Sequence, residues 1–143
     1  KLLETGVDIQ ELYNKMYSEP LKMKQLKAVF FSTIQLTKNK VAYRKNDLDF
    51  LRTYQVDTNT VSRGMVNQMA GIEEVLIWAN FTYDESTQSI VCELRSRDIP
   101  ILSIAQKHGG GGHLNACGCT VATWEETDVL LNELDQIMED YHG

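Results

Sequence analysis

A run of four glycines, residues 109–112, limits the fold of this chain more than any other feature of the sequence. Glycine disfavours a helix by about 1 kcal/mol per residue relative to alanine, so no helix continues through four in succession. The apolar residues after Pro100 therefore predict a short helix that ends at His108. Beyond the glycines, the sequence predicts one helical turn over residues 113–116 and a strand over residues 119–122.

A β-hairpin is predicted before this helix. From Val75 onward apolar residues recur with a period of two, which is typical of a strand, and the pattern continues to Tyr83. The polar cluster at residues 84–87 predicts a turn. Residues 89–95 are then predicted to return as the antiparallel partner.

Helical patterns occupy most of the remaining chain. Asp8 is a candidate cap for a helix that ends before Pro20, and Pro20 fits the first turn of a second helix. Further on, the sequence predicts a strand over residues 40–43 and helices over residues 47–54 and 62–70. Thr123 and Glu126 have the spacing of a capping box that opens a final helix. The inner stripe of that helix is predicted to consist of Val129, Leu130, Leu134, Ile137, Met138 and Tyr141.

These elements predict an α+β fold with a central mixed β-sheet flanked by helices. A chain of 143 residues is long enough for one domain with its own hydrophobic core. We predict that residues 1–36 form a pair of linker helices from a preceding domain and that residues 37–143 form the domain proper. Because the sequence begins without Met, we expect it to be a piece of a longer protein. Because it has no apolar leader, we expect no targeting segment within it.

Charge and cysteine content narrow the classes of function. The net charge of −6 disfavours non-specific binding of duplex nucleic acid, because such a surface repels phosphates. Residues 21–63 carry nine basic and three acidic side chains, so a short anionic ligand remains compatible. The three cysteines are too few for a disulfide framework and favour a reducing, cytoplasmic compartment. The longest apolar run has five residues, and a bilayer span needs about 18, so we predict no membrane contact.

The glycine run and His113 are the strongest candidates for a binding site. Successive glycines allow several main-chain N–H groups to face one anion, and the predicted helical turn after them adds a positive dipole end. His113 is then placed to hydrogen-bond a phosphate or to stabilise charge at the reacting centre. The alternative is a flexible loop that contains an incidental histidine.

Arg95, at the end of the returning strand, is a second candidate. Its guanidinium suits bidentate binding of a phosphate, and the hydroxyl of Ser96 follows it directly. The alternative is a surface arginine that forms an ion pair with Glu93 or Asp98.

These segments together resemble a known family. Leu94-Arg95-Ser96, the helix with Ile104-Ala105, the glycines before His113 and the ending Ala116-Cys117-Gly118 resemble the DHH-associated domain of the DHH phosphoesterases. The likeness is greatest to the branch of oligoribonucleases and phosphoadenosine-phosphate phosphatases, which includes exopolyphosphatase-related proteins. Residues 64–67 and 71–75 fit the same family, whereas residues 97–100 replace a turn that commonly contains glycine, so Arg97 inherits no role.

The resemblance implies a hydrolase that cleaves short oligonucleotides, 3′,5′-nucleotide bisphosphates or both. In this family an N-terminal DHH domain of the same chain binds the metal ions, usually two manganese ions, and this sequence contains no Asp-His-His triplet. We therefore expect no metal site in this chain and no activity of the fragment alone. Carried over by position, the resemblance makes His113 catalytic and assigns substrate binding to Arg95, Ser96, Gly110, Gly111, Gly112, His113 and Asn115.

Other functions stay open at this point. The chain fits a non-catalytic nucleotide- or RNA-binding module that uses the same loop. The full-length protein also fits a cyclic-dinucleotide phosphodiesterase or a nuclease of single-stranded DNA, since relatives of the family have these activities. A zinc site at His108, His113, Cys117 and Cys119 is disfavoured, because structural zinc sites usually space paired ligands by two to four residues.

Overall fold

The predicted hairpin forms the centre of the molecule. In the computed structural model, which describes residues 9–142, strand β3 (Ile77–Asp84) pairs with strand β4 (Ser89–Ser96) in antiparallel register. Ile77 lies opposite Ser96, and Asp84 lies opposite Ser89. In the turn between them, the carboxylate of Asp84 accepts hydrogen bonds from the N–H and the hydroxyl of Ser86. The polar cluster therefore closes the hairpin as predicted.

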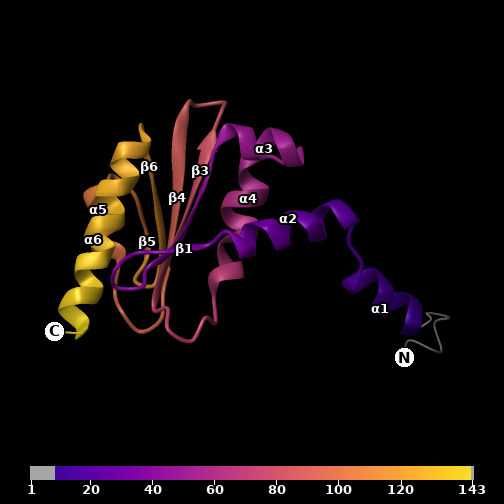
Figure 1. Cartoon of the computed structure of the whole chain (residues 1–143), viewed down its shortest axis with the longest axis horizontal. Helices are drawn as coiled ribbons and strands as arrows, with labels where there is room; N and C mark the ends of the chain where they lie inside the picture. Colours follow the sequence, from indigo (N-terminus) through magenta and orange to yellow (C-terminus); the bar gives the residue numbers. More distant parts are fainter. Residues whose placement is uncertain (1–8, 143) are drawn as a thin grey trace.

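The hairpin belongs to a six-stranded sheet within the described residues, in the order β1-β2-β3-β4-β6-β5 (Figure 1). Strands β2 and β3 are parallel and are joined by a helical crossover over residues 48–69, and the other neighbours are antiparallel. The α+β fold with a mixed sheet flanked by helices is confirmed. Besides β3 and β4, the elements are α1 (Ile9–Tyr17), α2 (Leu21–Ser32), β1 (Gln35–Leu36), β2 (Ala42–Asn46), α3 (Leu48–Tyr54), α4 (Thr58–Met65), the 3₁₀ helix η1 (Val66–Met69), α5 (Leu102–Lys107), β5 (Gly111–His113), β6 (Ala116–Val121) and α6 (Trp124–His142).

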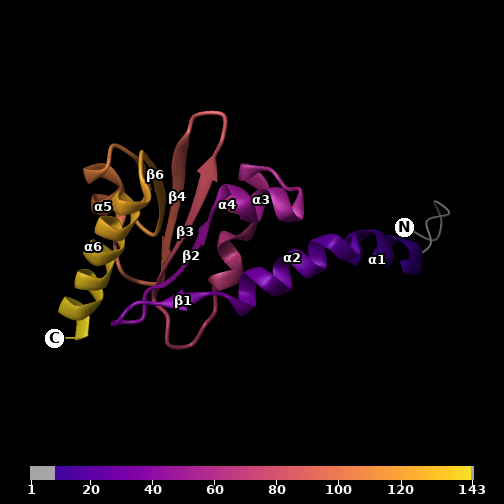
Figure 2. The same cartoon turned by 45° about the horizontal axis from the view of Figure 1, so that its top comes forward.

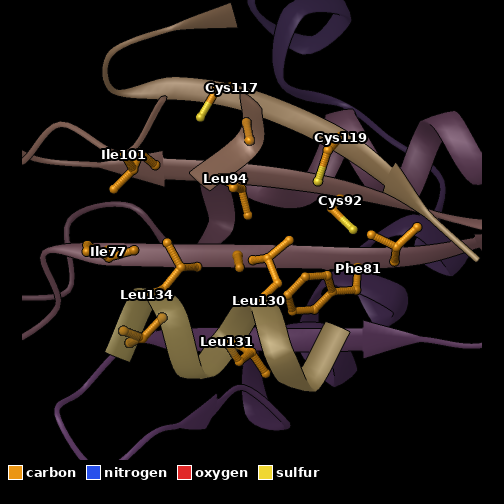
Figure 3. Packing of buried hydrophobic residues seen from close by; sticks show 14 of the residues in the cluster. Ile77, Phe81, Cys92, Leu94, Ile101, Cys117, Cys119, Leu130, Leu131 and Leu134 are labelled. Atoms are coloured by element: carbon orange, nitrogen blue, oxygen red, sulfur yellow. The ribbon is translucent and has the colours of Figure 1, made fainter. Parts of the chain in front are cut away.

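Helices α5 and α6 cover one face of the sheet. Leu130 and Leu134 of α6 lie beside Ile77 and Phe81 of β3 in Figure 3, in the same buried cluster as Leu131 and the cysteines of β4 and β6. The strands contribute every second residue to this core, as the two-residue period requires. The cysteines lie there as well: Cys117 and Cys119 are two residues apart, so they share a face and are both buried.

The second face is covered over β2 and β3 by α2, α3, α4 and η1, on the opposite side from α6 (Figures 1 and 2). Leu26 and Phe30 of α2 are fully buried in this second core, against Ala42 and Trp78 of the sheet. The predicted linker segment therefore contributes side chains to the core, although the boundary at residue 36 stays a prediction. Asp8, the predicted cap of α1, lies outside the described residues. No helix among residues 9–142 is long and apolar enough to cross a bilayer.

Three predicted elements have different bounds because of their caps and pairings. The strand predicted over residues 119–122 is β6 (Ala116–Val121), which pairs with β4. The helix predicted over residues 62–70 begins earlier, since the Asp57 carboxylate accepts a hydrogen bond from the Thr60 N–H at 2.7 Å and caps α4. Residues 66–69 of the predicted helix form η1 instead. The strand predicted over residues 40–43 is displaced to β2, where Ala42 pairs with Trp78.

The helical turn predicted over residues 113–116 is wrong. His113 ends β5 and Ala116 begins β6, so these residues form a hairpin in which the two are directly opposite. A two-residue connection is a standard antiparallel turn, and pairing with β4 selects it over a helix. In α6 the predicted stripe is also partly wrong: Val129 and Tyr141 are exposed, whereas Leu131 is buried.

Candidate functional site

Part of the second sheet face, over β4, β6 and β5, forms a pocket. His113 of β5 pairs with Ala116 of β6, which in turn pairs with Arg95 of β4. Residues directly opposite one another in a sheet project to the same face. Neighbouring strands lie nearly 5 Å apart, so the main chains at His113 and Arg95 are separated by roughly 10 Å with one small side chain between them.

The next row of the sheet forms the floor of this pocket. Gly111, Gly118 and Glu93 pair across β5, β6 and β4, each two residues from the row above. Because glycine has no side chain, the main chain is accessible here, and a cavity of about 560 Å³ results. It is lined by Arg63, Val91, Glu93, Arg95, residues 109–113 and residues 116–120.

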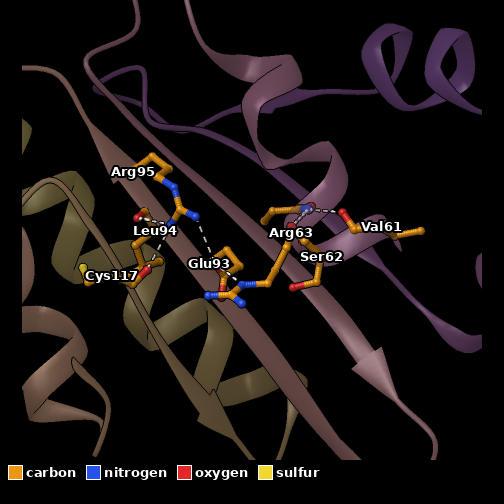
Figure 4. A network of polar contacts seen from close by, with 8 residues as sticks. Val61, Ser62, Arg63, Glu93, Leu94, Arg95 and Cys117 are labelled. Carbon is orange, nitrogen blue, oxygen red and sulfur yellow. Dashed lines mark hydrogen bonds and ion pairs between the residues drawn. The ribbon is translucent and has the colours of Figure 1, made fainter. Parts of the chain in front are cut away.

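Arg95 is held firmly at the wall of the cavity (Figure 4). Its Nη1 donates to the carbonyl oxygens of Leu94 at 2.9 Å and Cys117 at 3.4 Å, and its Nη2 donates to Glu93 at 3.0 Å. These contacts use three of the five N–H donors of a guanidinium, which leaves two for a ligand. The ion pair with Glu93 that we considered as an alternative does form, but it lies within the cavity rather than at an open surface.

Arg63 reaches the same carboxylate from helix α4. Its Nε lies 4.0 Å from Glu93 Oε1, and the side chain is largely exposed. The helix is fixed to the sheet by Asn80 of β3, whose amide donates to the carbonyl oxygens of Val61 and Ser62 at 2.8 and 3.0 Å. Asn80 in turn accepts a hydrogen bond from Asn46 at 2.7 Å. This buried network therefore determines which side of α4 presents Arg63 to the cavity.

The first two glycines terminate helix α5 through their N–H groups, although both also line the cavity, so contact of Gly110 with substrate stays a prediction. Gly109 has φ +82° and donates its N–H to Gln106, and Gly110 donates to Ala105 at 2.8 Å. This pair of bonds is the Schellman pattern of a helix C-terminus. The N–H groups of Gly109 and Gly110 are therefore engaged, and no helix N-terminus follows them. The prediction that the glycine N–H groups are free to face an anion is therefore wrong for Gly109 and Gly110.

The glycines at positions 110, 111 and 112 differ in whether the fold itself requires them. A Cβ at Gly110 would lie 2.0 Å from the Gly118 carbonyl oxygen, and one at Gly112 would lie 2.7 Å from the Cys117 Cα. A Cβ at Gly111 would have no atom within 4 Å. The fold therefore requires Gly110 and Gly112, whereas only a ligand close to the main chain would require Gly111.

The side chains of Ser96 and Asn115 lie side by side and are joined by a hydrogen bond. The Ser96 hydroxyl donates to the Ile99 carbonyl oxygen at 2.5 Å and accepts from the Asn115 amide at 2.9 Å. The Asn115 amide also donates to the Ile99 carbonyl oxygen at 3.0 Å. These bonds fix the loop after β4 beside the β5–β6 turn, and contact of either residue with substrate stays a prediction.

Two residues that line the cavity, Arg63 and Glu93, were not among the binding residues predicted from the sequence. Arg63 closes the basic segment, and Glu93 stands two residues before Arg95, so strand alternation placed it on the same face. Arg97 does not line the cavity, and its Nη2 donates to the carbonyl oxygens of Ile72, Glu73 and Val75. The His108 ring contacts Glu133 of α6 at 2.5 Å rather than facing the cavity.

No metal-binding cluster is present among residues 9–142, where no three His, Cys, Asp or Glu side chains could hold one ion. The three cysteines are free thiols within the core. Burial raises the pKa of Cys117 to about 11, and the neighbouring Cys119 thiol together with burial raises the pKa of Cys92. Because all three side chains are buried in the core, we assign them to packing.

Comparison with known proteins establishes the family. A family model described as the DHHA1 domain matches residues 50–140, which include every residue lining the cavity. The chain belongs to the DHHA1 domain family. The resemblance inferred from the glycine–histidine segment is thereby confirmed.

Relatives of this DHHA1 domain are larger proteins. The bifunctional oligoribonuclease and PAP phosphatase NrnA of Bacillus subtilis is 26% identical over 141 residues, which are 99% of this chain and 44% of that protein. An uncharacterized protein of Mycoplasma genitalium is 30% identical over 141 residues, 99% of this chain and 41% of that protein. The chain thus spans about two-fifths of the length of these relatives.

Solved structures show the same fold. An exopolyphosphatase-related protein from Bacteroides fragilis superimposes with a TM-score of 0.72 at 27% identity, over 98% of this chain and 41% of that one. The pGpG-specific phosphodiesterase PggH from Vibrio cholerae has a TM-score of 0.54 at 17% identity, over 83% of this chain and 40% of that one. The second likeness concerns the fold alone.

Proposed function

We propose that this DHHA1 domain binds the phosphate of a short single-stranded oligonucleotide or a 3′,5′-nucleotide bisphosphate. We propose further that the full-length protein hydrolyses the phosphoester bond. The observation that carries the proposal is the row in which His113 and Arg95 project to one face of the sheet with only Ala116 between them. The name of the Bacillus subtilis relative, an oligoribonuclease and PAP phosphatase, supports this class of substrate.

The two side chains suit complementary tasks. Arg95 keeps two N–H donors for phosphate oxygens while its other donors are bound to protein oxygens, so its orientation is set before the ligand arrives. His113 is exposed at the opposite wall, where its ring can donate a hydrogen bond to the same phosphate. Donors fixed around a phosphoryl group stabilise the charge that develops as the bond breaks.

Manganese belongs to this proposal as a cofactor bound outside the described residues. The residues of this chain do not fit it, since residues 9–142 present no cluster of ligands. We therefore propose that the ions are bound by an N-terminal DHH domain of the same protein and that this chain supplies substrate binding. The shares of 44% and 41% that the chain covers in its relatives leave room for such a domain in proteins of their length.

The test is hydrolysis by the full-length protein with manganese, on di- to pentanucleotides and on a nucleotide 3′,5′-bisphosphate. We expect His113→Ala to lower kcat/KM by about 10²-fold, the usual cost of one lost donor to a transition state. His142→Ala is the matched control, because His142 is exposed at the end of α6, which covers the other face.

Two results would change the proposal. A His113→Ala variant as active as the parent removes His113 from the mechanism. A full-length protein that binds these nucleotides but does not cleave them with manganese favours the non-catalytic binding module instead.

A further inference from the structure

The pocket that we propose for phosphate contains a carboxylate. The Glu93 side chain is only 12% exposed, and its Oε1 lies 3.0 Å from Arg95 Nη2 and 4.0 Å from Arg63 Nε. Its Oε2 lies 3.0 Å from the position that a Cβ at Gly118 would occupy. The negative charge is therefore located at the floor of the cavity, beneath any anion bound between Arg95 and His113.

Holding Arg95 in place does not explain this carboxylate. The guanidinium is already anchored by the carbonyl oxygens of Leu94 and Cys117 through its Nη1. The contact with Arg63 contributes little to stability, since that side chain is 73% exposed and its pair is screened by solvent. Glu93 lies where it opposes an anionic ligand, so its effect is expected in binding.

The net charge of the pocket affects singly and doubly charged phosphates differently. Arg63, Arg95 and Glu93 sum to +1, and without Glu93 the sum would be +2. A phosphodiester carries one negative charge, whereas a terminal phosphomonoester carries nearly two above its second pKa of about 6. A carboxylate at the floor repels the second class more strongly than the first.

We propose that Glu93 is a specificity-determining residue that favours a singly charged phosphodiester over a doubly charged terminal phosphate. This inference rests on the proposed function, because it concerns the same pocket. Of the two substrates proposed there, it ranks the oligonucleotide phosphodiester above the nucleotide bisphosphate, whose phosphates are both terminal. One unit charge about 5 Å away, in a pocket open enough to water for an effective dielectric constant of about 50–70, changes affinity by roughly fivefold to tenfold per unit of ligand charge. Removal of the Glu93 charge therefore strengthens binding of a dianion by that factor more than binding of a monoanion.

The experiment compares two ligands that differ by one methyl group and one charge. Adenosine 5′-monophosphate and its methyl phosphodiester are titrated into the 143-residue chain at pH 8 and low salt by calorimetry. Glu93→Gln keeps the shape of the side chain and removes its charge. Glu139→Gln is the control, since it removes the same charge from an exposed position on α6.

The expected result is a ratio. Glu93→Gln raises affinity for the monophosphate fivefold to tenfold more than for the methyl diester, and Glu139→Gln leaves that ratio unchanged. Equal changes for the two ligands, or weaker binding of both, overturn the inference and leave Glu93 as a positioning residue for Arg95; the proposed function then stands. Failure of both ligands to bind the parent and Glu93→Gln overturns the phosphate pocket itself.

Folding of the variant is checked separately. Circular dichroism and the melting temperature of Glu93→Gln are expected to match the parent. If they do not, Glu93→Ala repeats the titration, since the two carbonyl contacts of Arg95 do not depend on the residue at position 93. The ratio for that variant then supports or overturns the inference by the same criterion.

Discussion

The glycines before His113 allow a test that separates structural from functional glycines. We compare Gly110→Ala with Gly111→Ala, two identical substitutions at adjacent positions. At Gly110 the new Cβ would lie 2.0 Å from the Gly118 carbonyl oxygen and 2.7 Å from the Cys119 Cβ, so strand β6 or the loop must move. At Gly111 no atom lies within 4 Å of the new Cβ.

The magnitudes follow from these distances. Overpacking against backbone costs about 1–3 kcal/mol, whereas a methyl group in open space changes stability by less than about 0.5 kcal/mol. For a chain of this length, 1 kcal/mol corresponds to roughly 4 °C in Tm. We therefore expect Gly110→Ala to melt about 4–12 °C below the parent and Gly111→Ala to melt within about 2 °C of it.

Ligand binding gives the second readout. Gly111 shares a row and a face with Glu93, so a methyl group there projects into the cavity. We expect Gly111→Ala to weaken adenosine 5′-monophosphate binding while its melting temperature is unchanged. Thermal denaturation followed by circular dichroism and titration calorimetry measure both effects. Equal melting temperatures for the two variants would refute the assignment of Gly110 to the fold, and unaltered binding by Gly111→Ala would refute close approach of the ligand.

Three further predictions concern the rest of the molecule. Asn80→Ala removes the amide that donates to the Val61 and Ser62 carbonyl oxygens, so we expect the free energy of unfolding in urea to fall by about 2 kcal/mol. The control is Asn132→Ala at an exposed position of α6, for which we expect the same free energy of unfolding as for the parent. Burial raises the pKa of Asp135 and the hydrogen bonds from Thr37 and Asn39 lower it, with the net pKa below the ordinary 3.8. Its stabilising effect is thus present above pH 3.8 and lost as pH falls through the lower folded-state pKa; thermal melts from pH 7 to 2 should show a smaller acid loss in Asp135→Ala than in the parent. All three cysteines are buried, and burial raises the pKa of Cys117 to about 11, so iodoacetamide at pH 8 should label the native thiols far more slowly than the urea-unfolded ones. Equal rates by mass spectrometry would contradict the buried placement.

Local patterns in the sequence determined much of the fold. The two-residue period after Val75 and the polar cluster before Ser89 predict the β3–β4 hairpin, because strand alternation and turn chemistry are properties of neighbouring residues. The same holds for α6, which follows a Thr123 cap whose hydroxyl accepts from the Glu126 N–H. The glycine–histidine segment identified the family, and a match over residues 50–140 confirms it.

Tertiary structure alone decided the conformation after the glycines and the composition of the pocket. Residues 113–116 read locally as a helical turn, but Ala116 pairs with Arg95 of β4, and that long-range register makes them a hairpin. The same pairing brings His113 and Arg95 into one row. Arg63 joins them because Asn80 fixes α4 to the sheet, a contact across 18 or 19 positions of the chain that no local period reveals. Period and capping act between neighbours, whereas register and helix docking depend on which distant strands meet.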